Sequence, residues 1–229
     1  MTAVITVWQD IACPWATLAV YRLDRARTRL GLTDRIGLDL RAFPLELINS
    51  RPTPKGTLDA EIPVVGGLEP DFGWRRWRRR EWEWPVTTLG ALEAVYAAKE
   101  QGLQVSEGLD MALRRALFCD SRTISMHHEI LNAAEAVDGL DLKGLTTALE
   151  SGRFRPQVFD DYRIAQTTKV KGSPHLFLPD STDVHNPGVE LHWTDDHGYP
   201  IVDKDDPGIY ETLLMRAIEA GTKEEFSDG

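Results

Sequence analysis

Near the N-terminus, apolar and polar residues alternate and then change to helical spacing. Residues 2–8 are rich in β-branched side chains, which predicts a strand. Across residues 14–30 the apolar positions recur every three or four residues, which predicts a helix that Gly31 ends. Residues 36–43 predict a second strand. These elements form a βαβ unit, so we expect the two strands to be parallel.

The middle of the chain changes character at residue 86. Residues 44–85 carry prolines and glycines without a clean hydrophobic period, so we expect a long loop with short helices. Helical spacing then returns. It predicts helices at about residues 86–102, 107–119, from 125 onward, 142–151 and 155–169. Ser125 is the expected N-cap of the third of these.

The C-terminal part returns to strands. A turn at Gly172-Ser173-Pro174 leads into a predicted strand at 175–178, and a second strand follows at 189–193. Residues 209–220 predict a final helix. The order β-α-β, helical block, β-β-α indicates an α/β protein with a thioredoxin fold and an inserted all-helical domain. We assign residues 1–45 and 165–229 to the thioredoxin-like domain and residues 46–164 to the insertion, including its irregular N-terminal loop.

Charge and composition narrow the classes of function. The sequence of 229 residues has 26 Lys and Arg against 36 Asp and Glu, a net charge of -10. A negative field disfavours binding to nucleic acid. No apolar run is long enough to span a bilayer, and the start lacks the features of a signal peptide. We therefore expect a cytoplasmic protein with no membrane partner.

The chain contains two cysteines, Cys13 and Cys119. They are far apart, and with the nearest histidine pair, His127-His128, they make no zinc spacing, so we expect no metal site. Cys119 ends a predicted helix. It is interpreted as core packing, with a distant resolving thiol as the alternative. The acidic stretches at 195–196 and 203–206 lack calcium-loop spacing and are expected to be loops.

Cys13 stands where the first strand ends and the first helix begins. Free N–H groups at a helix N-terminus favour negative charge, so we expect a thiol pKa below the ordinary value of about 8.5. The thiolate would be a nucleophile. On spacing alone, a small buried apolar residue is an equal alternative.

Three stretches around this position carry a resemblance. They are Asp10-Ile11-Ala12-Cys13-Pro14-Trp15, then Gly152-Arg153-Phe154 with residues 158–165, and Val170-Lys171-Gly172-Ser173-Pro174. The chain resembles the DsbA-like thioredoxin-domain family, in its cytosolic branch near the polyketide-synthesis type of oxidoreductase. The resemblance covers nearly the whole chain except residues 49–84. It implies that Cys13 is the nucleophile and that the Ser173–Pro174 bond is cis.

The substrate groove is expected to form around these two segments. We place Pro14, Trp15, Ser173, Pro174 and His175 as substrate-binding residues, with His175 either near the thiol or pointing away along its strand. Asp10, which precedes the loop, is interpreted as a turn residue rather than a buried acid.

The sequence departs from the family at one decisive position. The family's motif is Cys-Pro-Trp-Cys, and here Ala16 replaces the second cysteine. Cys13 therefore has no local thiol to resolve a mixed disulfide. The first hypothesis is a monothiol oxidoreductase or thiol transferase that uses a small-molecule thiol or disulfide, with a low-molecular-weight thiol as co-substrate and no tightly bound cofactor.

Two other hypotheses stay open. One is a thiol-cofactor-dependent isomerase or transferase, similar to the kappa-class glutathione transferases and 2-hydroxychromene-2-carboxylate isomerase. The other is a non-catalytic binding module that uses residues 73–84, where Trp and Arg alternate. That segment is interpreted as docked tryptophans with paired arginines, with an anionic ligand or single-stranded nucleic acid as alternatives. The oligomeric state is open, a homodimer being one option.

Overall fold

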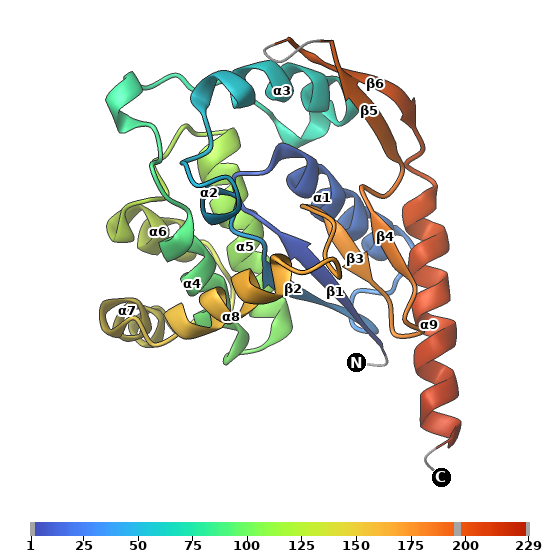
Figure 1. The fold of residues 1–229 in the computed structure, drawn as a ribbon. Coiled ribbons are helices and arrows are strands. Elements are labelled where there is room, and N and C mark those ends of the chain that lie inside the picture. The colour runs from blue at the N-terminus through green and yellow to red at the C-terminus, as the bar shows by residue number, and fades with distance from the viewer. Residues whose placement is uncertain (1–2, 195–197, 228–229) are drawn as a thin grey trace.

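The computed structural model describes residues 3–194 and 198–227 of the chain (Figure 1). Its main sheet has four strands in the order β2-β1-β3-β4. They are β1 (Ala3–Gln9), β2 (Ile36–Ala42), β3 (His175–Phe177) and β4 (Asp183–His185). β1 and β2 are parallel, as predicted, and β3 runs antiparallel to β1. This arrangement confirms the mixed α/β fold expected from the order of elements.

Helices surround this sheet. Their bounds are α1 (Pro14–Arg29), α2 (Leu45–Ile48), α3 (Lys55–Leu68), α4 (Leu89–Lys99), α5 (Leu103–Phe118), α6 (His127–Ala134), α7 (Leu142–Ser151), α8 (Arg155–Ala165) and α9 (Ile209–Ser227), with short 3₁₀ turns η1 (Pro70–Phe72) and η2 (Glu81–Glu83). α1 packs against α9, which contacts β1, while α5 and α8 contact β2. One buried apolar cluster runs from the sheet into the helices α4 to α8. The domain boundaries given above stay a prediction.

Two expectations for the chain's middle and end are wrong. Residues 44–85 are not mainly loop, because they contain the 14-residue helix α3. The other wrong expectation concerns the acidic stretch 203–206. The predicted strand at 189–193 is confirmed, although it does not join the main sheet. It is β5 (Val189–Trp193), which pairs with β6 (Pro200–Asp205) in a separate antiparallel sheet. The acidic stretch 203–206 therefore lies mostly in a strand, and the stretch 195–196 falls outside the described residues.

The predicted cap of α6 is also wrong. The helix begins at His127 with Met126 at the N-cap position. The Ser125 hydroxyl instead donates to the carbonyl of Thr87 (2.8 Å) and accepts from the Thr87 N–H (3.1 Å). The Ser125 hydroxyl therefore bonds to Thr87, which is distant in sequence, and does not cap the helix as the local pattern predicted.

One part of the fold matters most for the site. α3 contacts both α1 and β6, and in Figure 1 α3 and the β5–β6 pair lie together above the start of α1. We call α3 with the β5–β6 pair the cover. Among the described helices, none is long and apolar enough to span a membrane.

Candidate functional site

Cys13 is the N-cap residue of α1. Its extended backbone (φ -89°, ψ 113°) turns the chain from strand into helix, and Pro14 fills the first helical position. The Sγ atom accepts a hydrogen bond from the Ala16 N–H at 3.4 Å. It also donates to the carbonyl of Ser173 at 3.2 Å. The thiol therefore lies between a free helix N-terminus and the loop before β3.

That loop carries the second predicted feature. The Ser173–Pro174 peptide bond is cis, as expected from the sequence. The Ser173 hydroxyl accepts a hydrogen bond from the Asp10 N–H at 2.9 Å, and the Pro174 carbonyl accepts from Asn186 N at 3.1 Å. The structure thus brings Cys13 against the Ser173-Pro174 turn, although Cys13 and Ser173 are 160 residues apart in sequence.

The cover closes over this site. Cys13 is only 5% exposed and Trp15 only 8%. Apolar side chains of the cover pack in the same cluster as Cys13: Val64, Val65, Leu68, Val189, Leu191 and Val202. In this arrangement the thiol has little contact with solvent.

Asp10 is a buried acid as well as a turn residue, so the preference for a turn alone is wrong. One carboxylate oxygen accepts from the Ala12 N–H (2.8 Å), as in an Asx turn. The other accepts from Leu45 N (2.8 Å) and the Thr88 hydroxyl (3.3 Å). Burial outweighs these hydrogen bonds and raises the pKa of Asp10 to about 6. Asp10 ties the Cys13 loop to α2 and to the start of α4.

Glu61, on α3, is a residue of the site that sequence reasoning missed. Its carboxylate accepts a hydrogen bond from Trp15 Nε1 at 2.9 Å, and burial raises its pKa to about 7. The signal was present in the spacing. Leu58, Glu61, Ile62 and Val65 follow the i, i+3, i+4, i+7 pattern, which places the acid on the buried face of a helix.

The expectation of an acidic thiol is wrong for this structure. Burial, followed by the nearby charge of Glu61, raises the pKa of Cys13 to about 12. Hydrogen bonds to Ser173 and Ala16 act in the opposite direction but are weaker. The helix N-terminus is in place, but the cover removes the water that a thiolate needs.

His175 is turned away from proton transfer at the thiol. Its Nδ1 accepts from the Lys171 N–H at 3.1 Å and its Nε2 lies 2.7 Å from Asp183. Burial lowers the pKa of this fully buried ring. Both ring nitrogens are used within the β3–β4 region, so His175 supports the loop instead of the chemistry. Its place among the substrate-binding residues stays a prediction without support from these contacts.

Cys119 lies apart from the Cys13 cluster. Its thiol donates to the carbonyl of Phe72 at 3.3 Å and packs against the main core. Both cysteines are free. Among the described residues, no cluster of His, Cys, Asp and Glu has the arrangement to hold a metal ion.

The tryptophans of the Trp–Arg segment are largely docked, as the packing interpretation expects, and Arg79 pairs with Glu129. The indole N–H groups of Trp74, Trp77 and Trp84 donate to backbone carbonyls. Trp82 is the exception, since it is 76% exposed with Arg80 stacked on its ring. His127 and His128 are exposed, as expected.

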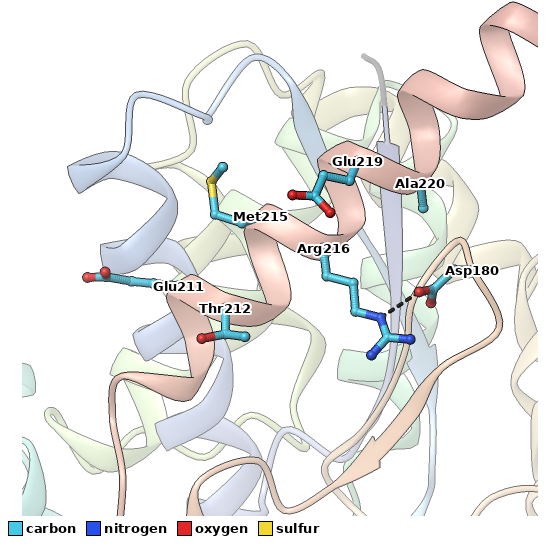
Figure 2. A pocket seen from close by; sticks show the side chains of 7 residues that line it. All are labelled: Asp180, Glu211, Thr212, Met215, Arg216, Glu219 and Ala220. Carbon is cyan, nitrogen blue, oxygen red and sulfur yellow. Dashed lines mark hydrogen bonds and ion pairs between the residues drawn. The ribbon is translucent and has the colours of Figure 1, made fainter.

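A surface depression along α9 is separate from this site. Figure 2 shows it between α9 and the loop after β3, where Arg216 donates to Asp180 at 2.5 Å. Its other lining side chains are Glu211, Thr212, Met215, Glu219 and Ala220. None of its lining residues belongs to the Cys13 cluster.

Comparison with known proteins identifies the fold. No family model and no curated protein matches the chain. Among solved structures, it is similar to a "probable DsbA oxidoreductase" of Streptomyces coelicolor (20% identity, 94% of this chain and 89% of that chain, TM-score 0.65). It is also similar to the cytosolic disulfide reductase DsbM of Pseudomonas aeruginosa, solved with glutathione (15%, 98% of each chain, 0.61). A third is 2-hydroxychromene-2-carboxylate isomerase (14%, 79% and 87%, 0.57). The chain has the DsbA-like thioredoxin fold that these structures share.

Proposed function

We propose that this protein is a thiol-disulfide oxidoreductase or thiol transferase that works through Cys13 alone. The position of Cys13 Sγ carries the proposal: it lies between the Ala16 N–H, at the start of α1, and the Ser173 carbonyl. A helix N-terminus stabilises a thiolate once water or substrate reaches it. The fold shared with a DsbA-type oxidoreductase and a disulfide reductase supports this use of the site.

The reaction follows from having one thiol. Cys13 loses its proton to solvent, and the thiolate attacks one sulfur of a disulfide R–S–S–R′. A Cys13–S–S–R bond forms while R′S⁻ leaves and takes up a proton. Ala16 offers no thiol to break this bond, so an external small thiol must attack it and regenerate Cys13. The glutathione in the DsbM structure supports such a co-substrate, and its cytosolic setting supports a cytoplasmic location here.

The closed cover sets a condition on this reaction. A thiol that is 5% exposed and has a pKa of about 12 reacts only when the cover separates from α1 or a substrate enters beneath it. Local opening exposes the helix N-terminus and removes the main cause of the raised pKa. We therefore place the substrate between Trp15, the Ser173-Pro174 turn and the cover.

A second function is favoured by the same raised pKa. A protonated Cys13 thiol can donate a hydrogen bond to the thiolate of a bound cofactor, as an isomerase or transferase would require. Cys13→Ser separates the two functions, because a serine hydroxyl keeps that donation but cannot form a disulfide. Retained activity with a thiol cofactor supports the second function, and complete loss supports the first.

The direct experiment traps the mixed disulfide. The Cys119→Ser variant is incubated with a small symmetrical disulfide, and mass spectrometry locates the adduct. We expect one adduct on Cys13 that an added small thiol removes. The contradicting result is a folded protein without an adduct on Cys13 under conditions in which Cys119 of the unmodified chain reacts. That result favours a non-catalytic binding module.

A further inference from the structure

The charges around the Cys13 thiol have one sign. The charged groups that act most strongly on it are Glu61 and Asp10, both acids. Glu61 accepts a hydrogen bond from the neutral Trp15 indole, and no cation among the described residues pairs with it. The side chains packed with Cys13 in its hydrophobic cluster, among them Val65 and Val189, are uncharged.

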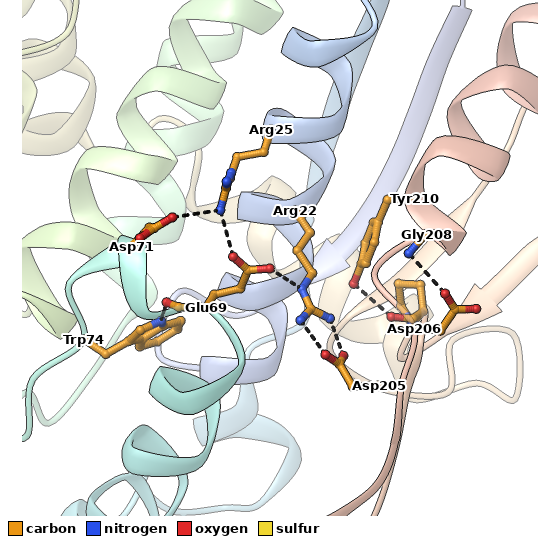
Figure 3. Close-up of polar contacts among 10 residues, drawn as sticks. Arg22, Arg25, Glu69, Asp71, Trp74, Asp205, Asp206, Gly208 and Tyr210 are labelled. Carbon is orange, nitrogen blue, oxygen red and sulfur yellow. Dashed lines mark hydrogen bonds and ion pairs between the residues drawn. The ribbon is translucent and has the colours of Figure 1, made fainter.

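The buried cations of this region are already neutralised. Arg114 donates to the carbonyl of Asp10 (3.4 Å) and to the Thr17 hydroxyl (2.6 Å). Its charge is paired with the carboxylate of Asp110 (2.6 Å). On the other side, Arg22 is paired with Glu69 and Asp205 (Figure 3). Neither guanidinium is free to meet a carboxylate on a substrate.

We infer that the site around Cys13 favours uncharged or cationic thiols and disulfides over anionic ones, and that ionised Glu61 sets this preference. The co-substrate here is then a small thiol that lacks the excess negative charge of glutathione, the thiol in the DsbM structure. The inference rests on the proposed function of Cys13. A substrate that replaces the contacts of Val65 and Val189 must offer apolar surface there. A carboxylate brought into the same space loses its water and meets an acid in place of a cation.

The test compares small symmetrical disulfides that differ in end charge. 2-Hydroxyethyl disulfide is neutral, cystamine is cationic and 3,3′-dithiodipropionate is anionic. Rates of mixed-disulfide formation on Cys13 are measured in the Cys119→Ser background and divided by the rates for the same chain unfolded in urea. In the folded protein we expect the anionic reagent to lag the neutral one by about tenfold or more. Cystamine should react at least as fast as the neutral reagent.

Glu61→Gln assigns the effect to one residue. The amide keeps an oxygen for Trp15 Nε1 but carries no charge, so the gap between the anionic and the neutral reagent should narrow by about tenfold. All three rates should also rise by a common factor, because the charge of Glu61 no longer raises the pKa of Cys13. Asp59→Asn, which removes a carboxylate on the same helix that pairs with Lys55, is the matched control and should leave the gap unchanged.

The possible outcomes distinguish a failure of this inference from a failure of the proposed function. Equal relative rates for the three reagents in the unmodified pocket overturn the charge preference and leave Cys13 as the nucleophile. A Glu61→Gln variant that changes all rates by one factor overturns the role of Glu61. A folded protein that reacts with none of the reagents overturns the proposed function, and the inference with it.

Discussion

Helix α1 carries two buried polar sites beneath the same cover, and they are built in opposite ways. At its start, the acid Glu61 of α3 accepts a hydrogen bond from the Trp15 indole, and within the described part of the chain no cation pairs with it. Further along, Arg22 donates through both terminal nitrogens to Asp205 at 2.6 and 2.9 Å, and through Nε to Glu69 at 2.9 Å. Figure 3 shows this cluster, to which Arg25 adds a further pair with Glu69.

The difference indicates that the two buried sites along α1 have different roles. A buried cation with full hydrogen bonding to two acids fixes the position of the elements that carry them. Here those elements are the end of α3 and the end of β6, so Arg22 holds both parts of the cover on α1. A buried acid without a cation lowers stability and gives no such fixation, which is typical of a site retained for chemistry.

The largest loss of stability is expected when the ion pairs of Arg22 are removed. Arg22→Met leaves Glu69 and Asp205 without their main partner, and we expect a loss of about 3 kcal/mol in the free energy of unfolding. The cover should also open more often, so Cys13 should react faster with iodoacetamide. Urea unfolding and alkylation rates measure the two effects.

A matched control limits the interpretation of that variant. Arg29→Met removes an arginine on the same helix whose pair with Glu211 is exposed, and it should cost less than about 1 kcal/mol. Equal losses for the two variants, or an unchanged reactivity of Cys13 in Arg22→Met, would show that Arg22 does not hold the cover.

Removing the charge of Glu61, at the start of α1, should raise the free energy of unfolding instead of lowering it. Burial raises the pKa of Glu61 from 4.5 to about 7, so its ionisation lowers the stability of the folded state as pH rises through that interval. Glu61→Gln cannot ionise. It should therefore raise the free energy of unfolding by about 2 kcal/mol at pH 8 and change it little at pH 4.

Thermal or urea unfolding at the two pH values checks this prediction. Asp59→Asn serves again as the control on α3 and should show no such dependence on pH. A stabilisation of the same size at pH 4 and pH 8 would mean that the charge of Glu61 is not its cause.

Local signals predicted the parts of the site that depend on neighbours in sequence. The β-branched run of β1, the helical spacing of α1 and the Ser173-Pro174 turn before β3 all appear in the structure. α3 was missed because Pro63 and the pair Gly66-Gly67 weaken its helical signal.

The prediction of an acidic thiol was wrong because the groups that decide its pKa are distant from it in sequence. The helix N-terminus is a local feature, and it is present at Cys13. The cover and Glu61 come from segments 40 or more residues away, and no local pattern states that they fold over the thiol. Their burial of the thiol outweighs the helix terminus, which reverses the direction of the pKa shift.

The smallest expected change in stability comes from restoring a second thiol beside Cys13. Ala16 is fully buried, and its N–H already donates to Cys13 Sγ, so Ala16→Cys adds one sulfur atom one helical turn from the first. We expect a loss below about 1.5 kcal/mol in the reduced form. Residues three apart on a helix are close enough to bridge, so the variant should form a disulfide and oxidise a reduced peptide. Ala19→Cys, a buried position on the same helix that is too far along to bridge, is the control. Mass spectrometry after alkylation counts the free thiols. If Ala16→Cys stays folded under oxidising conditions with all three thiols free (Cys13, Cys119 and the introduced one), the geometry assigned to Cys13 is wrong and the single-thiol mechanism fails with it.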